Sequence, residues 1–271
     1  MNREVVTIKV FRFDPDKDKE PYFDSFKVQV KKGMTVLEAL FDILENQDGS
    51  LGFRYSCRGA ICGSCAMHIN GSYRLACQTQ IEKLEVEEIV IKPLGHLPVI
   101  KDLVVDMRPF FEKYESIIPY LISNPKKDPL LFSSKTKQRG QVDPSPSASG
   151  GGSKSGNSET KEQLQSLKER ARIDEMIDCI LCGCCHASCT MTLTDKDYLG
   201  PATLLKANRF YMDSRDKGGI SRLKLVDGEH GVWRCHTIFN CNEVCPKYIN
   251  PTRSIAKLKR GLIKNKILGR M

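Results

Sequence analysis

Two cysteine-rich runs decide how this chain of 271 residues folds: Cys179-Ile-Leu-Cys182-Gly-Cys184-Cys185-His-Ala-Ser-Cys189 and Cys235-His-Thr-Ile238-Phe-Asn-Cys241-Asn-Glu-Val-Cys245-Pro246. Both fit the spacing C-x2-C-x2-C-x3-C, with Ile238 in place of the second cysteine of the second run. The second run keeps a proline after its last cysteine, where the first has Thr190. Because the two runs share one spacing, we expect them to be the two halves of one site.

This spacing is typical of proteins that hold two iron–sulfur clusters, in which the fourth cysteine of each run ligates the other cluster. The crossed arrangement predicts one [4Fe-4S] cluster, held by Cys179, Cys182, Cys185 and Cys245. It predicts a second cluster held by Cys189, Cys235 and Cys241. Isoleucine cannot donate an electron pair to iron, so Ile238 leaves one corner without a protein ligand. We therefore expect a [3Fe-4S] cluster, unless water or another residue fills that corner.

One cysteine of the first run, Cys184, is surplus to this scheme. It could replace Cys185 only by breaking the two-residue spacer. Free cysteine often behaves as a small hydrophobic residue, so Cys184 is expected to be a buried thiol.

A second motif lies in the first third of the chain, Cys57-Arg-Gly-Ala-Ile-Cys62-Gly63-Ser-Cys65, with Cys77 further on. The spacing C-x4-C-x2-C…C is that of a plant-type [2Fe-2S] cluster. Glycines such as Gly63 suit a loop that wraps a cluster, because such a loop needs unusual backbone angles and close approach. The sequence therefore predicts a third cluster, ligated by Cys57, Cys62, Cys65 and Cys77.

The composition leaves one different class of protein open. Twelve cysteines without a secretory signal favour metal sites over disulfides. The net charge of +9 is compatible with nucleic acid, an anionic membrane surface or a solvated exterior. A zinc-stabilised nucleic-acid-binding module is thus the alternative, although zinc sites usually pair two separate C-x2–4-C knuckles. The sequence contains no G-x-G-x-x-G dinucleotide-binding fingerprint.

Hydrophobic periodicity predicts strands first and helices later. Residues 4–13 and 22–31 are expected to form a pair of strands, with a helix after the capping box Thr35-Val-Leu-Glu38. A hairpin about Asn70-Gly71 and a last strand over 88–92 follow. Regular structure is expected to end at Pro93, Gly95 and Pro98, before a helix over 104–122 broken by Pro119.

The C-terminal half is expected to be helical. A charged helix should run from Lys161 to the first cysteine run, with Leu164, Leu167 and Ile173 on its inner side. Further helices are expected over 201–213 and after Asn250, each with a proline near its first turn. The last helix carries basic residues and no acidic one, so it could face anionic lipid or an acidic partner, or simply solvent.

These patterns divide the chain into a domain over 1–106 and an α-helical domain over 107–271. Residues 133–160 are rich in Ser, Gly, Lys and Pro and predict a flexible low-complexity insert within the second domain. The chain shows no secretory h-region and no transit-like N-terminus, and no apolar stretch long enough to span a membrane.

A plant-type [2Fe-2S] domain followed by two crossed cysteine runs resembles the iron–sulfur subunit of succinate dehydrogenase and fumarate reductase. Supporting stretches are Arg54 to Cys65, Lys101-Asp-Leu-Val-Val-Asp106, Tyr211-Met-Asp-Ser-Arg-Asp216 and Asn250-Pro-Thr-Arg253. The resemblance covers nearly the whole chain except 133–160, and the run about Cys235 looks more like the succinate dehydrogenase branch. It implies an α+β protein: a plant-type ferredoxin (β-grasp) domain, then an all-helical bacterial-type two-cluster ferredoxin domain.

The resemblance also implies a function and partners. A separate flavoprotein would oxidise succinate at FAD, and electrons would pass singly through the three clusters to a quinone. The quinone would lie at the [3Fe-4S] end, beside membrane-anchor subunits that can carry haem b. The subunit would be peripheral on the cytoplasmic face of the inner membrane, and no nucleic acid would be bound. A fumarate reductase or a thiol-linked reductase is the alternative within this class.

The quinone end departs from the family pattern. Ubiquinone-reducing members commonly have a proline after the fourth cysteine of the first run and a tryptophan soon after, and Thr190 to Asp197 contains neither. His236 matches a family position near the quinone, with Ile238 close by, and its alternative role is to donate a hydrogen bond to sulfur or backbone. The quinone type therefore stays open, menaquinone included.

Overall fold

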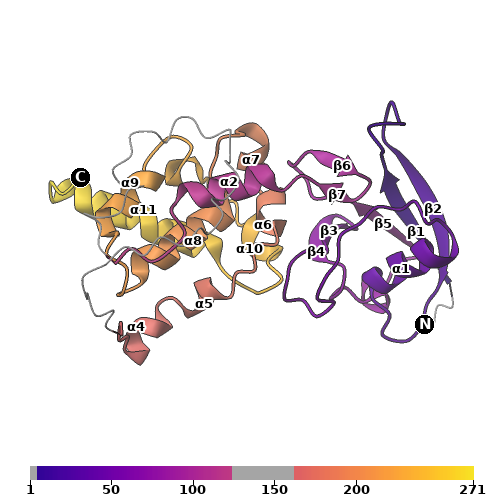
Figure 1. The fold of residues 1–271 in the computed structure, drawn as a ribbon, viewed down its shortest axis with the longest axis horizontal. Coiled ribbons are helices and arrows are strands. Elements are labelled where there is room, and N and C mark those ends of the chain that lie inside the picture. Colours follow the sequence, from indigo (N-terminus) through magenta and orange to yellow (C-terminus); the bar gives the residue numbers. More distant parts are fainter. Residues whose placement is uncertain (1–4, 124–161) are drawn as a thin grey trace, which may run out of the picture.

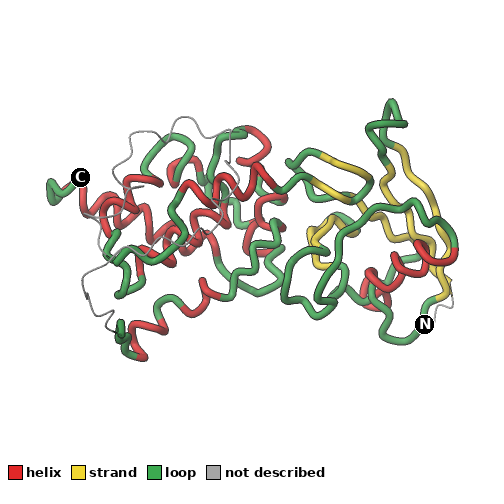
Figure 2. The backbone as a smooth tube through the Cα atoms, viewed as in Figure 1, coloured by secondary structure: helices red, strands yellow, loops and turns green. Residues whose placement is uncertain are grey.

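The computed structural model describes residues 5–123 and 162–271 of the chain. Figure 1 shows the strands gathered at one end of an elongated molecule and most helices at the other, and Figure 2 shows the same division by element type. The expected insert at 133–160 lies outside the described residues. The strand-rich and helix-rich halves confirm the expected α+β class.

The first half is a mixed five-stranded sheet in the order β2-β1-β5-β3-β4. Its strands are β1 (Val5–Arg12), β2 (Tyr22–Gln29), β3 (Ala66–Ile69), β4 (Ser72–Leu75) and β5 (Glu88–Lys92). Strand β1 pairs antiparallel with β2 and parallel with β5, while β3 pairs antiparallel with β4 and β5. Alternate residues of β1 (Val6, Ile8 and Val10) are buried, which is the period expected of a strand with one covered face.

Helix α1 (Val36–Asn46) begins at the predicted capping box. The backbone N–H of Glu38 donates to Thr35 Oγ1 at 3.2 Å, and the N–H of Thr35 donates to a carboxylate oxygen of Glu38 at 2.7 Å. Leu40 and Ile43 of this helix are fully buried in the same core as the sheet. Burying each such side chain stabilises the fold by about 1.5–3 kcal/mol.

Two short strands after β5 correct the expectation that regular structure ends at Pro93. Strands β6 (Val99–Lys101) and β7 (Val104–Val105) form a hairpin, so the helix expected over 104–122 begins later, as α2 (Arg108–Ser116). The hairpin turn is held by Asp102, which is 1% exposed and accepts from Arg12 Nε at 3.1 Å and from the Gly52 N–H at 2.8 Å. A buried ion pair between residues far apart in sequence thus fastens the hairpin to the sheet.

The second half is helical throughout its described part, as expected. After α2 its helices are α4 (Leu167–Ala171), α5 (Asp174–Ile177), α6 (Cys184–Ala187), α7 (Thr190–Thr194), α8 (Pro201–Met212), α9 (Gly219–Val226), α10 (Asn240–Glu243) and α11 (Pro251–Ile267). A 3-10 turn, η3 (Val232–Arg234), precedes the second cysteine run, and another, η1 (Ile81–Leu84), lies in the first half. The prolines stand at the starts of α8 and α11 as predicted, and Asn250 Oδ1 accepts from the Arg253 N–H at 2.7 Å.

The prediction of one charged helix from Lys161 to the first cysteine run is wrong in its length and in the inner side assigned to Leu164 and Leu167. The segment forms two short helices, α4 and α5, because Ser166 and Glu169 make a second capping box that starts a helix at Leu167. Leu164 and Leu167 are 81% and 89% exposed, whereas Ile173 is fully buried as expected.

Candidate iron–sulfur sites

The loop between α1 and β3 places backbone N–H groups around two cysteine sulfurs. Cys57 Sγ accepts from the N–H groups of Gly59 at 3.4 Å, Ile61 at 3.3 Å and Cys62 at 3.2 Å. Cys62 Sγ accepts from the N–H groups of Cys57 and Ser64, both at 3.5 Å. Donors aimed at sulfur favour the thiolate, which is the form that binds metal.

Left-handed backbone lets this loop turn its amides inward. Arg58 and Ala60 have φ values of 54° and 57°, and Gly63 has a φ of 76°. Hydrogen bonds from the Ser64 hydroxyl and from the backbone N–H groups of Cys57 and Ser64 lower the pKa of Cys62 to about 6. Burial instead raises the pKa of Cys65 to about 12, and that thiol also interacts with Cys77. The four predicted [2Fe-2S] ligands are therefore neighbours, two at the exposed rim and Cys65 beneath it.

The two later cysteine runs cross, as their spacing predicts. One cavity is lined by Cys179, Cys182, Cys185 and Cys245, together with apolar residues such as Leu205 and Ile249. Three of its cysteines come from the stretch around α6 and the fourth from the loop before α11. The tertiary structure thus brings together the four residues assigned to the [4Fe-4S] cluster.

A separate cavity collects the other three cysteines. Cys189, Cys235 and Cys241 line it, and Ile238 lines it where a fourth cysteine would stand. Lys259 Nζ donates to the Cys235 carbonyl at 2.9 Å, and Cys241 Sγ lies 3.4 Å from Thr252 Oγ1. None of the residues that line this cavity is a fourth cysteine, although the thioether residue Met191 also lines it. The donor set matches the three ligands assigned to the [3Fe-4S] cluster.

The surplus thiol Cys184 is fully buried, as expected from the sequence. It does not line the four-cysteine cavity. Its S–H is the main reason why the pKa of the neighbouring Cys182 is lowered, because it donates a hydrogen bond to that sulfur.

The chemistry of these cavities fits iron–sulfur clusters. Thiolate is the soft ligand that such clusters require. Burial raises the pKa of five of the seven thiols that line the two cavities, namely Cys179, Cys185, Cys189, Cys241 and Cys245. A bound cationic centre supplies the charge that makes deprotonation of such buried thiols favourable.

The residues predicted near a quinone lie at the rim of the three-cysteine cavity. His236 is exposed, and Ile238 and Phe239 are each 49% exposed beside it. Trp233 is exposed nearby and donates from Nε1 to Asp227 at 2.8 Å. Sequence reasoning missed Tyr198 and Thr252, which also line this cavity, because an isolated Tyr or Thr carries no spacing signal.

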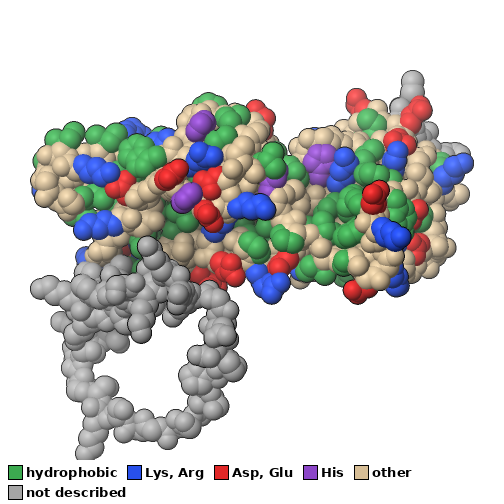
Figure 3. Space-filling model, turned by 90° about the horizontal axis from the view of Figure 1, so that it is seen from above, with side chains coloured by type: hydrophobic (Ala, Val, Ile, Leu, Met, Phe, Trp, Pro, Cys, Tyr) green, Lys and Arg blue, Asp and Glu red, His purple; other side chains and the backbone are tan. Residues whose placement is uncertain are grey.

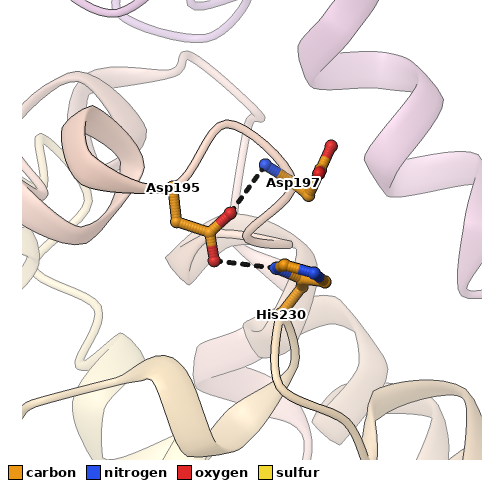
Figure 4. A group of neighbouring side chains, drawn as sticks. All are labelled: Asp195, Asp197 and His230. Carbon is orange, nitrogen blue, oxygen red and sulfur yellow. Dashed lines mark hydrogen bonds and ion pairs between the residues drawn. The ribbon is translucent and has the colours of Figure 1, made fainter.

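Three further side chains form a small polar group next to the loop before α8 (Figure 4). Asp195 accepts from the Asp197 N–H at 2.9 Å and lies 2.8 Å from His230 Nδ1. Arg234 Nε lies 3.4 Å from the same Asp195 carboxylate. This ion pair fastens the stretch after the first cysteine run to the stretch before the second.

The face of the molecule in Figure 3 carries Lys, Arg, Asp and Glu side chains interspersed over both halves. A nucleic-acid interface instead concentrates positive charge in a stripe or patch. This face therefore gives no support to the nucleic-acid alternative.

A plant-type thiol loop on a sheet, joined to a helical part with two crossed cysteine sites, defines the class of a multi-cluster iron–sulfur electron-transfer protein. Residues 7–112 match the family described as a 2Fe-2S iron-sulfur cluster binding domain, and residues 175–249 match the 4Fe-4S dicluster domain. Both matched families are iron–sulfur domains, so the zinc-module alternative is not supported.

The whole chain is similar to a characterised subunit. It is 39% identical over 259 residues to the protein named "Succinate dehydrogenase [ubiquinone] iron-sulfur subunit, mitochondrial" of Candida glabrata, a match that covers 94% of this chain and 90% of the relative. The chain belongs to the family of succinate dehydrogenase iron–sulfur subunits. Its function is electron transfer within an oxidoreductase complex, with [2Fe-2S], [4Fe-4S] and [3Fe-4S] clusters as cofactors.

Solved structures share the fold. A chain of the Mycobacterium smegmatis Sdh1 complex in the apo form matches with a TM-score of 0.77 at 24% identity, covering 97% of both chains. A hypothetical protein from Helicobacter pylori matches with a TM-score of 0.54 at 17% identity, covering 96% of this chain and 40% of that one. Within the described residues, no helix is both long enough and apolar enough to cross a bilayer.

Proposed function

We propose that the chain conducts electrons from the FAD of a flavoprotein subunit to a membrane quinone, in the direction of succinate oxidation. In this proposal Cys57, Cys62, Cys65 and Cys77 hold the [2Fe-2S] cluster, Cys179, Cys182, Cys185 and Cys245 hold the [4Fe-4S] cluster, and Cys189, Cys235 and Cys241 hold the [3Fe-4S] cluster. The observation that carries it is the separation of seven cysteines into the two crossed cavities.

Packing between the two halves supports this order of clusters. A Cβ atom built at Gly63, in the first cysteine loop, would lie 2.8 Å from Cys182 Cβ and 3.3 Å from the Ile180 carbonyl oxygen. The loop of the first site therefore rests on the loop of the second without an intervening side chain. The second and third sites share the two crossed runs, so the three sites form a continuous series.

The two ends of the series suggest the partners. Around the first site, Tyr55 and Ile61 are exposed, and they offer an apolar surface for the flavoprotein. At the other end, Ile238 and Phe239 are exposed and line the three-cysteine cavity, and Trp233 is exposed two residues before Cys235. We place the quinone and the membrane-anchor subunits there, with His236 and Ile238 nearest the quinone.

The location of the subunit is part of the same proposal. The subunit would be peripheral on the cytoplasmic face of the inner membrane, held by anchor subunits.

We place the boundary between its two domains after Asp106, because the Asp102 turn of the β6–β7 hairpin is bonded to Arg12 of the sheet.

Electron paramagnetic resonance of the anaerobically purified complex tests the ligand assignment. The chain should bind about nine irons, the sum of the three cluster types, with no stoichiometric zinc. The oxidised protein should give a three-iron signal. Ile238→Cys should convert that signal toward a four-iron cluster, because it supplies the missing thiolate.

Ile238→Ala is the matched control, since it removes the same side chain without adding sulfur. It should keep the three-iron signal. If Ile238→Cys leaves the cluster type unchanged, the assignment of the vacant corner to position 238 is wrong. Co-purification of a flavoprotein active on succinate separates this function from that of a thiol-linked reductase.

A further inference from the structure

The three-cysteine cavity contains a hydroxyl that the assignment of ligands does not use. Tyr198 lies in the loop before α8, is fully buried and lines the cavity with Cys189, Cys235 and Cys241. Within the described residues, its hydroxyl oxygen is buried and has no hydrogen-bond partner. Buried polar groups are nearly always paired, so an unpaired hydroxyl among these cysteines points to a hydrogen bond that forms when their sulfurs ionise to bind metal.

The electrostatics of the site make this hydroxyl a donor. A tyrosine hydroxyl ordinarily has a pKa of about 10, so it keeps its proton at neutral pH and can donate it. Of the three sulfurs of the cavity, that of Cys235 is the one within reach of the Tyr198 hydroxyl once the thiol ionises. A thiolate is a stronger acceptor than a thiol, because hydrogen bonds to ionised groups are the strong ones.

The other two sulfurs of the cavity already have donors. The backbone N–H groups of Met191 and Thr192 donate to the Cys189 sulfur and favour its thiolate. The Thr252 hydroxyl, 3.4 Å from Cys241 Sγ, and the backbone N–H of Cys241 both favour the thiolate of Cys241. Within the described residues, Cys235 is therefore the sulfur of this cavity that lacks such a donor, and Tyr198 is placed to supply it.

We propose that Tyr198 is a positioning residue whose hydroxyl donates a hydrogen bond to the thiolate of Cys235 and raises the reduction potential of the cluster held there. The proposal rests on the function proposed above. Hydrogen bonds to cluster sulfurs are among the factors that set these potentials. Such a bond stabilises the more negatively charged, reduced state, and so favours arrival of the electron at the end of the series.

Tyr198→Phe tests the proposal because it removes the hydroxyl and keeps the ring. The measurement is a redox titration of the full complex, followed by the oxidised three-iron resonance. We expect a decrease in the midpoint potential that corresponds to roughly a tenfold change in the equilibrium constant for reduction, or about 59 mV for one electron. The potentials of the other two clusters and the iron content should not change.

Tyr211→Phe is the matched control. Tyr211 packs against the same core cluster as Tyr198 but does not line the cavity. Its variant should leave the midpoint potential unchanged.

A second measurement follows the proton of the Tyr198 hydroxyl. In the native complex, an exchangeable proton coupled to the oxidised cluster should be replaced in deuterium oxide, and that coupling should be missing in Tyr198→Phe.

Two failures are distinguishable. If the native complex lacks an oxidised three-iron signal, the ligand assignment is wrong and the role of Tyr198 falls with it. If the signal is present and Tyr198→Phe leaves its midpoint potential and proton coupling unchanged, only the role of Tyr198 is refuted. Should Tyr198→Phe not retain the cluster, 3-fluorotyrosine at position 198, a more acidic donor, should raise the midpoint potential, and an unchanged value would overturn the proposal.

Discussion

The contact between Gly63 and Cys182 gives the sharpest test of how the two halves of the molecule meet. Gly63→Ala places a Cβ atom 2.8 Å from Cys182 Cβ and 2.9 Å from Cys182 Cα, where ordinary contacts are 3.4 Å or longer. The φ of 76° at Gly63 adds a second penalty, because an L side chain is strained in left-handed backbone.

The expected magnitude is the sum of these two effects. Left-handed backbone costs an alanine about 1–2 kcal/mol. Overpacking a well-filled interface costs about 1–3 kcal/mol more. Gly63→Ala should therefore reduce stability by about 2–5 kcal/mol.

Gly33→Ala separates the two effects. Gly33 has the same φ of 76°, but a Cβ there would meet nothing within 4 Å. It should lose about 1–2 kcal/mol, the backbone penalty alone. The difference between the two variants then measures the contact between the first and second cluster loops.

The assay compares apparent melting temperatures at one scan rate, because unfolding of cluster-containing proteins is often irreversible. The extra 1–3 kcal/mol should lower the apparent melting temperature of Gly63→Ala by about 2–12 °C relative to Gly33→Ala. The magnetic interaction between the [2Fe-2S] and [4Fe-4S] clusters should weaken in Gly63→Ala only. Equal melting temperatures and an unchanged interaction would show that the loops have room for a methyl group.

Three other perturbations have definite expected outcomes. The Asp195 hydrogen bond, with the charges of Asp195, Asp197 and Glu229, raises the pKa of His230, so this ion pair stabilises the fold fully below the unfolded pKa of histidine and is lost as pH rises through the folded pKa. An NMR titration of His230 should show the raised pKa in the native protein and a lower one in Asp195→Asn; equal values would contradict the pairing. Asp216→Ala should cost about 3–5 kcal/mol in denaturation experiments, because it leaves the buried Arg222 guanidinium, 2.6 Å from Asp216, without its carboxylate. Thr35→Ala should cost about 1 kcal/mol and lower the apparent melting temperature by about 2–4 °C, and no loss would mean that the capping box does not stabilise α1.

The features that depend on near neighbours in the chain were predicted well from the sequence. The capping box at Thr35 and the Asn70-Gly71 hairpin use residues within a few positions of one another, and both are present. The cysteine spacings have the same character, because a loop of fixed length around a cluster fixes which sulfurs can reach it. The crossing rule extends this to two runs, and the cavities that collect Cys179 with Cys245, and Cys189 with Cys235, have the predicted membership.

Features that depend on distant partners were missed. The β6–β7 hairpin is too short to show a strand period, and its turn is held by a pair between Arg12 and Asp102 that lie 90 positions apart. The prediction that Leu164 and Leu167 lie on the inner side of a helix is wrong, because none of the described elements buries these two residues. A helical period indicates a buried face only where another element covers that face.

The amino-acid sequence by itself determined the cluster types, the crossed pairing of the cysteine runs and the class of each half, because ligand identity and loop length are local properties. Only the tertiary structure decided that Gly63 rests on Cys182 and that the Tyr198 hydroxyl lies unpaired against the sulfurs of the third site. These contacts join residues that no local spacing relates. The first exists only once the two halves have packed together, and the second only once the helical half has folded.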